Sequence, residues 1–121
     1  NGRWVLAGRP TIPQLTLTTT GRKSGRRREV QLAALHEDDG SFVVVASNFG
    51  QEHHPAWMYN LEADPRAWVL SDGVETEVEA KSLGAAEKDE IWPRLHEIVP
   101  QFRTYLDRTD RDIRIFRLTP V

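Results

Sequence analysis

Residues 14–36 read QLTLTTTGRKSGRRREVQLAALH. In segments 14–19 and 28–36, apolar side chains alternate with polar ones, and the first segment is rich in β-branched threonine. Such alternation predicts strands with one buried face. The GRKSG segment at 21–25 lies between them and predicts a turn, because glycine is a strong turn signal. The stretch therefore predicts a strand, a basic turn and a returning strand.

Four further strands and three helices are predicted outside this stretch. Asp72-Gly73 is the strongest signal for a two-residue hairpin in the chain. Pro93 interrupts a helical pattern of apolar residues and predicts a kink, or a late helix start near Trp92. The predicted strands are 41–46, 66–71, 74–80 and 113–118. One predicted helix begins near Pro55, a second covers 85–98 and a third covers 101–106.

These elements predict a mainly β fold with inserted helices, of the α+β class, in one domain over residues 1–121. The strands are too short for a wide sandwich and close more naturally into a small barrel, which also removes exposed edges. We therefore expect a barrel-like sheet of about six mostly antiparallel strands, with the helices on one side. A chain that opens at Asn1 is also expected to have lost an N-terminal segment.

The basic residues are concentrated near the N-terminus of a chain whose net charge is only −2. Residues 1–28 contain seven Lys and Arg and no acid, so the remainder carries a net charge of −9. There is no Cys, which excludes disulfides and thiolate ligands. With 39% hydrophobic and 28% charged residues, the composition is that of a folded globular chain and argues against disorder.

Five of these seven basic residues lie in segment 22–28, in and just after the predicted turn. Arginine forks and glycine amides together can surround one phosphate or carboxylate group. A solvated basic hairpin and a nucleic-acid contact are the alternatives. The second is disfavoured, because no aromatic residues separate the basic ones and the acidic remainder would repel a polyanion. We therefore predict that this segment binds a small anionic ligand. The sequence has no Walker motif, so a nucleoside triphosphate is not predicted.

Other groups of polar residues carry weaker signals. Ser47-Asn48-Phe49-Gly50 leaves a predicted strand just before a helix, where backbone N–H groups suit an anion or a polar ring edge, and an ordinary connection is the alternative. The adjacent His53 and His54 do not share a helix face, so no metal site is predicted. No nucleophile motif of a hydrolase is present. Phe102 and Tyr105 lie on one side of a short predicted helix, in the core or in a pocket wall.

Four motifs follow one another along the chain: LTLTTTGRKSGRRR at 15–28, VVVASNFG at 43–50, HPAWMYNLEADPRAWV at 54–69, and a late stretch from Phe102 to Arg111. Together they resemble the deazaflavin-dependent nitroreductase family, whose members use coenzyme F420. The resemblance implies a split β-barrel related to flavin-binding barrels. It also implies a reductase that passes hydride from the reduced coenzyme to an electron-poor acceptor, a quinone or a nitroaromatic. The alternatives are an FMN-binding barrel reductase and a deazaflavin carrier without turnover.

The resemblance also implies roles for individual residues. Those implied to hold the phosphate and oligoglutamate tail of the coenzyme are Arg22, Lys23, Arg28 and, through its hydroxyl and backbone, Ser24. Those implied to surround the deazaflavin ring are Ser47, Asn48, Gly50, Pro55 and Trp57. Those implied to line the substrate pocket are Met58, Phe102 and Tyr105. No catalytic residue is assigned, and either Tyr105 or a water could donate the proton.

The sequence departs from the family pattern where a characterised member presents tyrosines to its substrate. The matching positions here are Ala33, Met58, Val99, Phe102 and Tyr105. Only Tyr105 keeps a phenol, so we expect a more apolar acceptor than a nitroimidazole. The expected partner is a small molecule, without nucleic acid, and the expected location is cytoplasmic. Peripheral membrane contact stays open, because the N-terminal segment that covers the site or meets a membrane in some relatives is reduced here to residues 1–13.

Overall fold

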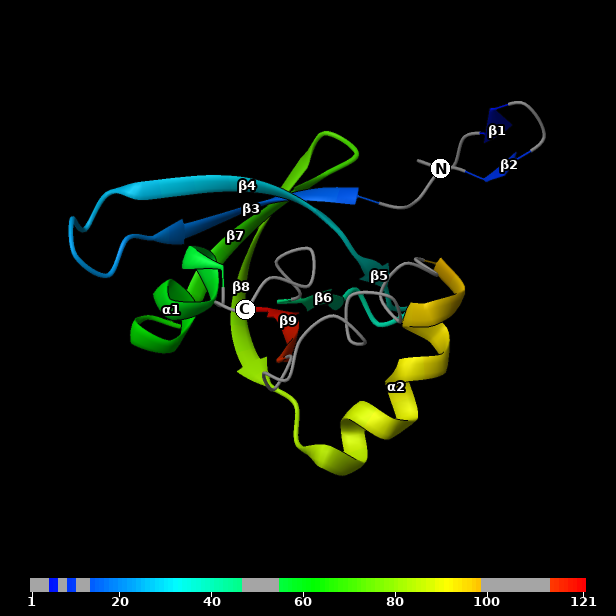
Figure 1. The fold of residues 1–121 in the computed structure, drawn as a ribbon. Helices are drawn as coiled ribbons and strands as arrows, with labels where there is room; N and C mark the ends of the chain where they lie inside the picture. The colour runs from blue at the N-terminus through cyan, green and yellow to red at the C-terminus, as the bar shows by residue number, and fades with distance from the viewer. Residues whose placement is uncertain (1–4, 7–8, 11–13, 47–54, 99–113) are drawn as a thin grey trace.

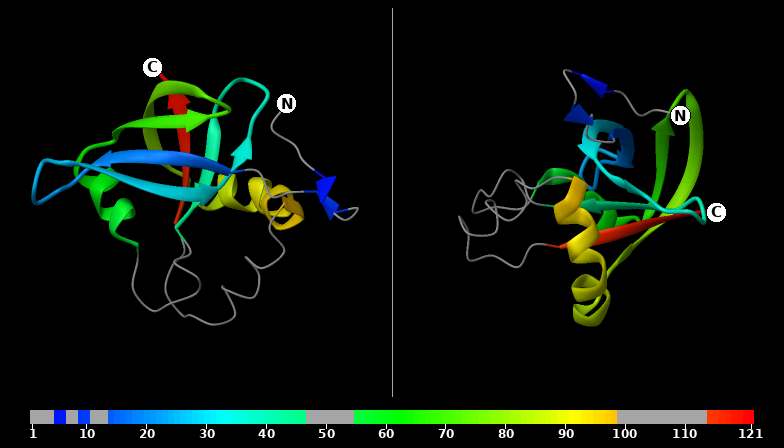
Figure 2. Two further views of the ribbon diagram at one scale, coloured as in Figure 1. Left: turned by 90° about the horizontal axis from the view of Figure 1, so that it is seen from above. Right: turned by 90° about the vertical axis from the view of Figure 1, so that its right-hand side faces the viewer.

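The computed structural model describes residues 5–6, 9–10, 14–46, 55–98 and 114–121. Figures 1 and 2 show a curled sheet with two helices. The elements of this part of the chain are, in order, β1 (Val5–Leu6), β2 (Arg9–Pro10), β3 (Gln14–Thr20), β4 (Arg27–Ala33), β5 (Leu35–His36), β6 (Phe42–Val45), α1 (Ala56–Ala63), β7 (Arg66–Ser71), β8 (Val74–Ser82), α2 (Ala85–Ile98) and β9 (Ile115–Pro120).

The seven strands β3 to β9 form one antiparallel sheet with the order β4-β3-β7-β8-β9-β6-β5. β4 and β5 are the two edges of this sheet, although only Ala34 separates them in the chain. The sheet must therefore curl so that the end of β4 comes next to the start of β5, and Figure 1 shows β4 arching across the molecule into β5. This is the predicted split barrel, a mainly β fold with inserted helices.

Alternation along β3 separates the inside of the barrel from the outside. Leu15, Leu17 and Thr19 are buried, and the threonines between them lie half-buried on the outer face. Removing one leucine side chain from water stabilises a protein by about 1.5–3 kcal/mol, so the inner cluster is a main source of stability. The strand residues of this inner core are Leu15, Leu17, Val44, Ala67, Val69, Val78, Phe116 and Leu118.

The two helices pack on opposite faces of the sheet. α1 buries Trp57, Met58 and Leu61 in the inner core. α2 buries Ile91 and Leu95 in a second cluster, together with outward-facing side chains of β6 and β9. The expectation that both helices lie on one side is therefore wrong. β6 and β9 carry apolar residues on both faces, and each apolar face must be covered.

The predicted strands are all present, and segment 28–36 is divided at Ala34 into β4 and β5. The last strand lies two residues later than the predicted 113–118. β1 and β2 were not predicted, because two-residue strands leave no period to detect. The predicted helix 101–106 lies outside the described residues.

The helix predicted over 85–98 is present, but the late start near Trp92 is wrong. α2 begins at Ala85 and continues through Pro93. Proline lacks the N–H that would bond the carbonyl of Asp89, and both residues are exposed, so water can satisfy that carbonyl. Neither of the two helices in the described ranges is long and apolar enough to cross a membrane.

An ion-pair network ties α2 to the outer face of the barrel. Arg117 of β9 donates to both carboxylate oxygens of Glu37, at 2.7 and 3.3 Å, and to Glu87 of α2 at 3.5 Å. Arg94, also in α2, lies 3.7 Å from the same Glu37 carboxylate. The hydrogen bond that Arg117 donates to Glu37 raises the pKa of Arg117. Glu37 is thus the central acceptor of the network.

Glu37→Gln is expected to lower the free energy of unfolding by about 1.5–3 kcal/mol, because it removes the charge from a largely buried acceptor of guanidinium bonds. Urea denaturation measures this loss. Glu77→Gln is the matched control, since Glu77 pairs with Arg66 at 2.5 Å but both side chains are 45% exposed. An exposed pair contributes about 0–1 kcal/mol. Equal losses in the two variants would show that Glu37 has no special role.

Candidate functional site

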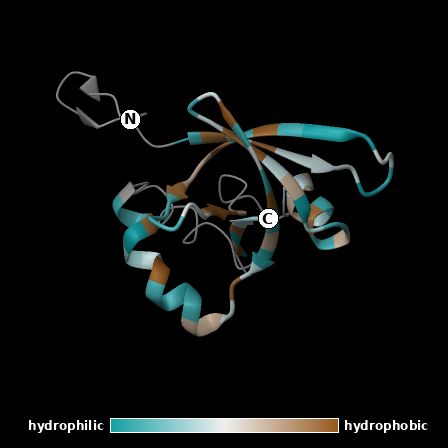
Figure 3. Cartoon of the chain, turned by 180° about the vertical axis from the view of Figure 1, so that it is seen from behind, coloured by the Kyte–Doolittle hydropathy of each residue, from teal (hydrophilic) through white to brown (hydrophobic). Residues whose placement is uncertain are grey.

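The turn between β3 and β4 forms the hydrophilic tip of the hairpin in Figure 3. The Gly21 N–H donates to the Arg26 carbonyl at 2.7 Å, and the Gly25 N–H donates to the Gly21 carbonyl at 2.8 Å. The Ser24 hydroxyl accepts from the Arg26 N–H at 3.2 Å. Gly25 has a φ of 71°, a left-handed conformation that glycine adopts without steric cost. These bonds fix the backbone of the basic turn.

A side chain at Gly21 would crowd the Ser24 hydroxyl and the backbone of the turn. A Cβ atom there would lie 2.7 Å from Ser24 Oγ and 3.2 Å from the Arg26 carbonyl oxygen. Gly21→Ala is therefore expected to displace the turn and to lower the free energy of unfolding by about 1–3 kcal/mol, measured by urea denaturation. Gly84→Ala is the control, because a Cβ at Gly84 meets no atom within 4 Å. A loss in Gly21→Ala no larger than in this control would contradict the prediction.

We call residues 21–28 the basic turn. Its cations differ from the arginines elsewhere in the described ranges because they have no carboxylate partner there. Arginines 66, 94, 114 and 117 each form an ion pair with a glutamate. Within the described ranges, no carboxylate lies within 4.0 Å of the basic groups at positions 22, 23, 26, 27 and 28, and all five residues are exposed. Cations gathered without carboxylates produce a positive potential that attracts an anion. The turn is therefore a candidate anion site.

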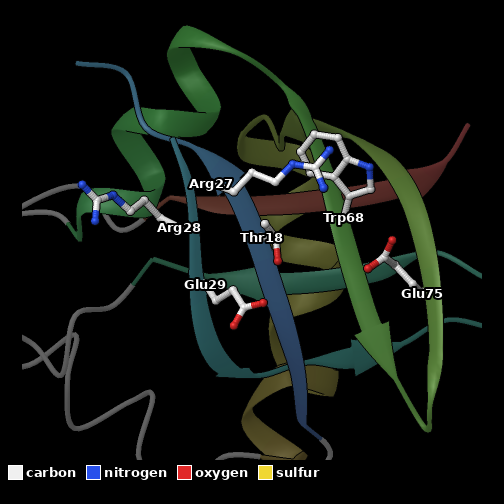
Figure 4. A pocket seen from close by; sticks show the side chains of 6 residues that line it. All are labelled: Thr18, Arg27, Arg28, Glu29, Trp68 and Glu75. Atoms are coloured by element: carbon white, nitrogen blue, oxygen red, sulfur yellow. The ribbon is translucent and has the colours of Figure 1, made fainter. Parts of the chain in front are cut away.

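Arg27 and Arg28 point in different directions, as Figure 4 shows. In the β3–β4 register Arg28 is opposite the buried Thr19, and Arg27 is opposite Thr20 on the outer face. The Arg27 guanidinium carbon lies 3.9 Å from the centroid of the Trp68 ring. Strand alternation thus points the Arg27 side chain away from that of Arg28, although both residues border the pocket described next.

Arg27 and Trp68 line an open pocket of about 460 Å³ on the outer face of the sheet. Its other lining residues are Thr18, Arg28, Glu29 and Glu75. Two carboxylates and an arginine already stacked on tryptophan make this pocket a poor anion site. No motif in the sequence predicts this pocket, because the pairing of β3 with β7 brings Thr18 opposite Trp68 across 50 residues of chain. The alternation of side chains within each strand is the sequence signal for this pocket, because it indicates which residues share the outer face.

Three of the residues implied to contact the ring or the substrate lie in or beside α1: Pro55, Trp57 and Met58. Pro55 precedes the helix with φ −68° and ψ 150° and makes no side-chain capping bond. Trp57 is 7% exposed and packs edge-on against Phe116, with ring centroids 6.0 Å apart. Met58 is 1% exposed. The structure therefore places Trp57 and Met58 in the inner core at the start of α1.

The structure brings α1 and the basic turn together at Arg22. The Arg22 N–H donates to Asn60 Oδ1 at 3.1 Å, and the Arg22 guanidinium lies over the ring of Tyr59. Neither Tyr59 nor Asn60 was predicted as a site residue, because no local pattern indicates a contact between residues 38 positions apart. Lys23 and Ser24 lie exposed beside Arg22 in the turn.

Several predicted site residues lie outside the described part of the chain: Ser47, Asn48, Gly50, Val99, Phe102 and Tyr105. Ala33, matched in the sequence to a substrate-facing tyrosine, packs against the cluster beneath α2 on the outer face. In the described ranges no three His, Asp or Glu side chains are arranged to hold a metal ion.

A family model, a relative and a solved structure that are each described as F420-dependent reductases match this chain. Residues 4–120 match the family described as F420H(2)-dependent quinone reductase. An F420H(2)-dependent quinone reductase of Mycobacterium tuberculosis is 32% identical over 117 residues, 88% of this chain and 73% of the relative. The solved structure of an F420-H2 dependent reductase, FDR-A, has a TM-score of 0.80 and 33% identity, covering 95% of this chain and 97% of that one.

Another solved structure, described as a domain-swapped dimer, also has a TM-score of 0.80 and 33% identity, covering 89% of this chain and 81% of that one. The predicted relation to coenzyme F420-dependent reductases is thereby confirmed. The chain belongs to the F420H(2)-dependent quinone reductase family.

Proposed function

We propose that this protein passes hydride from reduced coenzyme F420 to a quinone, and that the basic turn holds the anionic tail of the coenzyme. The observation that carries the proposal is that Arg22, Lys23 and Arg28 have no carboxylate partner within the described ranges, whereas the four arginines in other elements do. A charge-assisted hydrogen bond contributes about 1.5–3 kcal/mol, so three such cations are sufficient for tight binding of a phosphate and a carboxylate chain.

The residues present fit this coenzyme by their charge and by their backbone. The tail carries phosphate and carboxylate groups, and the exposed cations of the turn supply donors for both. The absence of a side chain at Gly21 keeps the turn tightly closed beside Arg28, whose Cγ atom would be 3.8 Å from a Cβ there. A long polyanion fits less well, because β8 presents Glu75, Glu77 and Glu79 on the outer face.

When bound, the coenzyme supplies the hydride, so the chain has to bind it, orient it and exclude water. The basic turn fixes the tail, and α1 packs its first turn into the barrel beside it. Reduction of the acceptor also requires a proton, and we propose that Tyr105 or a water donates it. The residues proposed to border the ring are Ser47, Asn48, Gly50, Pro55 and Trp57.

A quinone is the proposed acceptor, and nitroaromatic compounds are the second candidates. The family description supports a quinone. Positions 58 and 102 carry apolar side chains in place of tyrosines, and this favours a flat, weakly polar acceptor. Such an acceptor offers few hydrogen-bond partners, so it suits a pocket that has few polar groups to be left without a partner. Met58, Phe102 and Tyr105 are the residues proposed to line this pocket.

Fluorescence titration of oxidised coenzyme F420 with the protein tests the proposal. Saturable binding is expected at micromolar protein, weakened by salt because the charged groups of the turn are exposed. FMN, which lacks the oligoglutamate tail, is expected to bind more weakly. Tighter binding of FMN would favour an FMN-dependent reductase instead. A flat titration with F420 at micromolar protein would overturn the proposed function.

A further inference from the structure

Arg22 is held by α1 at two points. Its backbone N–H donates to Asn60 Oδ1 at 3.1 Å, and its guanidinium carbon lies 4.7 Å from the centroid of the Tyr59 ring. Stacking of an arginine on an aromatic ring is favourable and restricts the guanidinium in space. Two consecutive residues of α1 therefore constrain both the backbone and the side chain of Arg22.

Asn60 is itself fixed from the opposite side. Its Nδ2 group donates to Thr19 Oγ1 at 3.1 Å, and Asn60 and Thr19 are 7% and 0% exposed. An amide buried among apolar side chains is costly unless its groups are hydrogen-bonded. Here one side chain joins the end of β3, the basic turn and α1, across 38 and 41 residues of chain. A leucine would fill this space without making either bond.

The other two cations implied to hold the tail lack comparable support. Lys23 and Arg28 are exposed, and no side chain in the described ranges hydrogen-bonds or stacks against them. Arg22 is therefore the cation of this set whose position is fixed before any anion arrives. A cation that is already oriented loses less conformational freedom on binding, which favours affinity.

We infer that Asn60 and Tyr59 are positioning residues, which fix Arg22 against α1 for the anionic tail of the coenzyme. The inference rests on the proposed function. α1 also carries Trp57, so the same helix would set the distance between the contacts to the ring and the contacts to the tail. Weakening this link should reduce coenzyme affinity through Arg22, whereas the rate at saturating coenzyme should change little.

The link itself can be tested without any coenzyme. In Asn60→Ala the Arg22 amide is expected to exchange its hydrogen about tenfold faster or more, since it loses its acceptor, while the Gly25 amide, bonded to Gly21, is expected to change less. Thr19→Val removes the anchor of Asn60 and should have a smaller effect in the same direction. Thr19→Ser keeps the hydroxyl and should resemble the wild type. An unchanged Arg22 amide in Asn60→Ala would overturn the inference.

A double-mutant cycle distinguishes positioning from a general loss of stability. Asn60→Ala is expected to raise the Kd of F420 about tenfold in the wild type, but less than about twofold when Arg22 is already alanine. Tyr59→Leu should behave in the same way, and Tyr59→Phe, which keeps the ring, should restore most of the affinity. The KM for reduced F420 should follow the Kd, with kcat within about twofold of the wild type. Equal effects in both backgrounds would show that Asn60 acts only on stability.

A titration with inorganic phosphate tests the positioning of Arg22 independently of the proposed function. Phosphate is expected to shift the Arg22 amide resonance in the wild type, and to do so only at higher concentration in Asn60→Ala. If F420 fails to bind while this difference remains, the proposed function fails and the positioning of Arg22 stands. If F420 binds and neither Asn60→Ala nor Tyr59→Leu changes its Kd, the proposed function stands and the positioning role is wrong.

Discussion

Reversing two charges of the basic turn, in Arg22→Glu combined with Lys23→Glu, is expected to weaken F420 binding by a factor of about 10²–10⁴. The change removes two charge-assisted bonds of about 1.5–3 kcal/mol each, and every 1.4 kcal/mol corresponds to a factor of ten. In the described ranges neither side chain forms an ion pair with a carboxylate, so no ion pair of the fold is broken there. Fluorescence titration gives the Kd of both proteins.

Lys81→Glu is the matched control, because it reverses an exposed charge on β8, away from the turn. It is expected to leave the Kd within about twofold of the wild type, since a single exposed charge at a distance is screened by salt. The double variant loses the stacking of Arg22 on Tyr59, worth about 0.5–1 kcal/mol at an exposed site, so its unfolding midpoint should fall only slightly. An unchanged affinity in the double variant would remove the assignment of the tail to this turn.

Trp57→Ala is expected to cost about 3–5 kcal/mol of the free energy of unfolding, which is a large share of the 5–15 kcal/mol that holds a typical domain together. Trp57 is 7% exposed, lies in the inner core and packs edge-on against Phe116 of β9. Truncation would leave a cavity where α1 meets the barrel. Urea denaturation monitored by circular dichroism measures the loss.

Two further variants test whether the loss of stability comes from the core position of Trp57 and not from the removal of any tryptophan. Trp57→Phe keeps an aromatic contact to Phe116 and is expected to retain most of the stability. Trp68→Ala removes a half-buried tryptophan from the outer face, where Arg27 stacks on it, and is expected to cost less than Trp57→Ala. A loss in Trp57→Ala no greater than in Trp68→Ala would contradict the position of Trp57 in the core.

The strands could be predicted because their signals are local. The alternation in 14–19, the Asp72-Gly73 turn and the apolar run 42–45 each lie within a few residues of chain, and the structure has β3, the β7–β8 hairpin and β6 at these places. The pairings of β3 with β4 and of β7 with β8 also follow from local turn signals, whereas the pairings of β3 with β7 and of β9 with β6 and β8 could not be predicted in the same way. The division of one segment into β4 and β5 at Ala34 depends on the curvature of the whole sheet.

The candidate site was predicted where a motif was continuous in sequence. The basic turn at 21–28 was visible as a run of charges, but the run alone could not show which cations share a face. Strand alternation sends Arg27 to Trp68 on the outer face, away from Arg28. The link from Asn60 to Arg22 and Thr19 joins segments about 40 residues apart, and it depends on where α1 docks.

Turnover with reduced coenzyme F420 and a quinone, under anaerobic conditions, tests the proposed function most directly. The return of the fluorescence of the oxidised coenzyme reports hydride transfer. The expected result is many turnovers per protein molecule, with one coenzyme oxidised per quinone reduced. The Arg22→Glu, Lys23→Glu variant should lose this activity at low coenzyme concentration and regain part of it at high concentration. Tight binding of F420 without turnover on any quinone would contradict the reductase and indicate a coenzyme carrier.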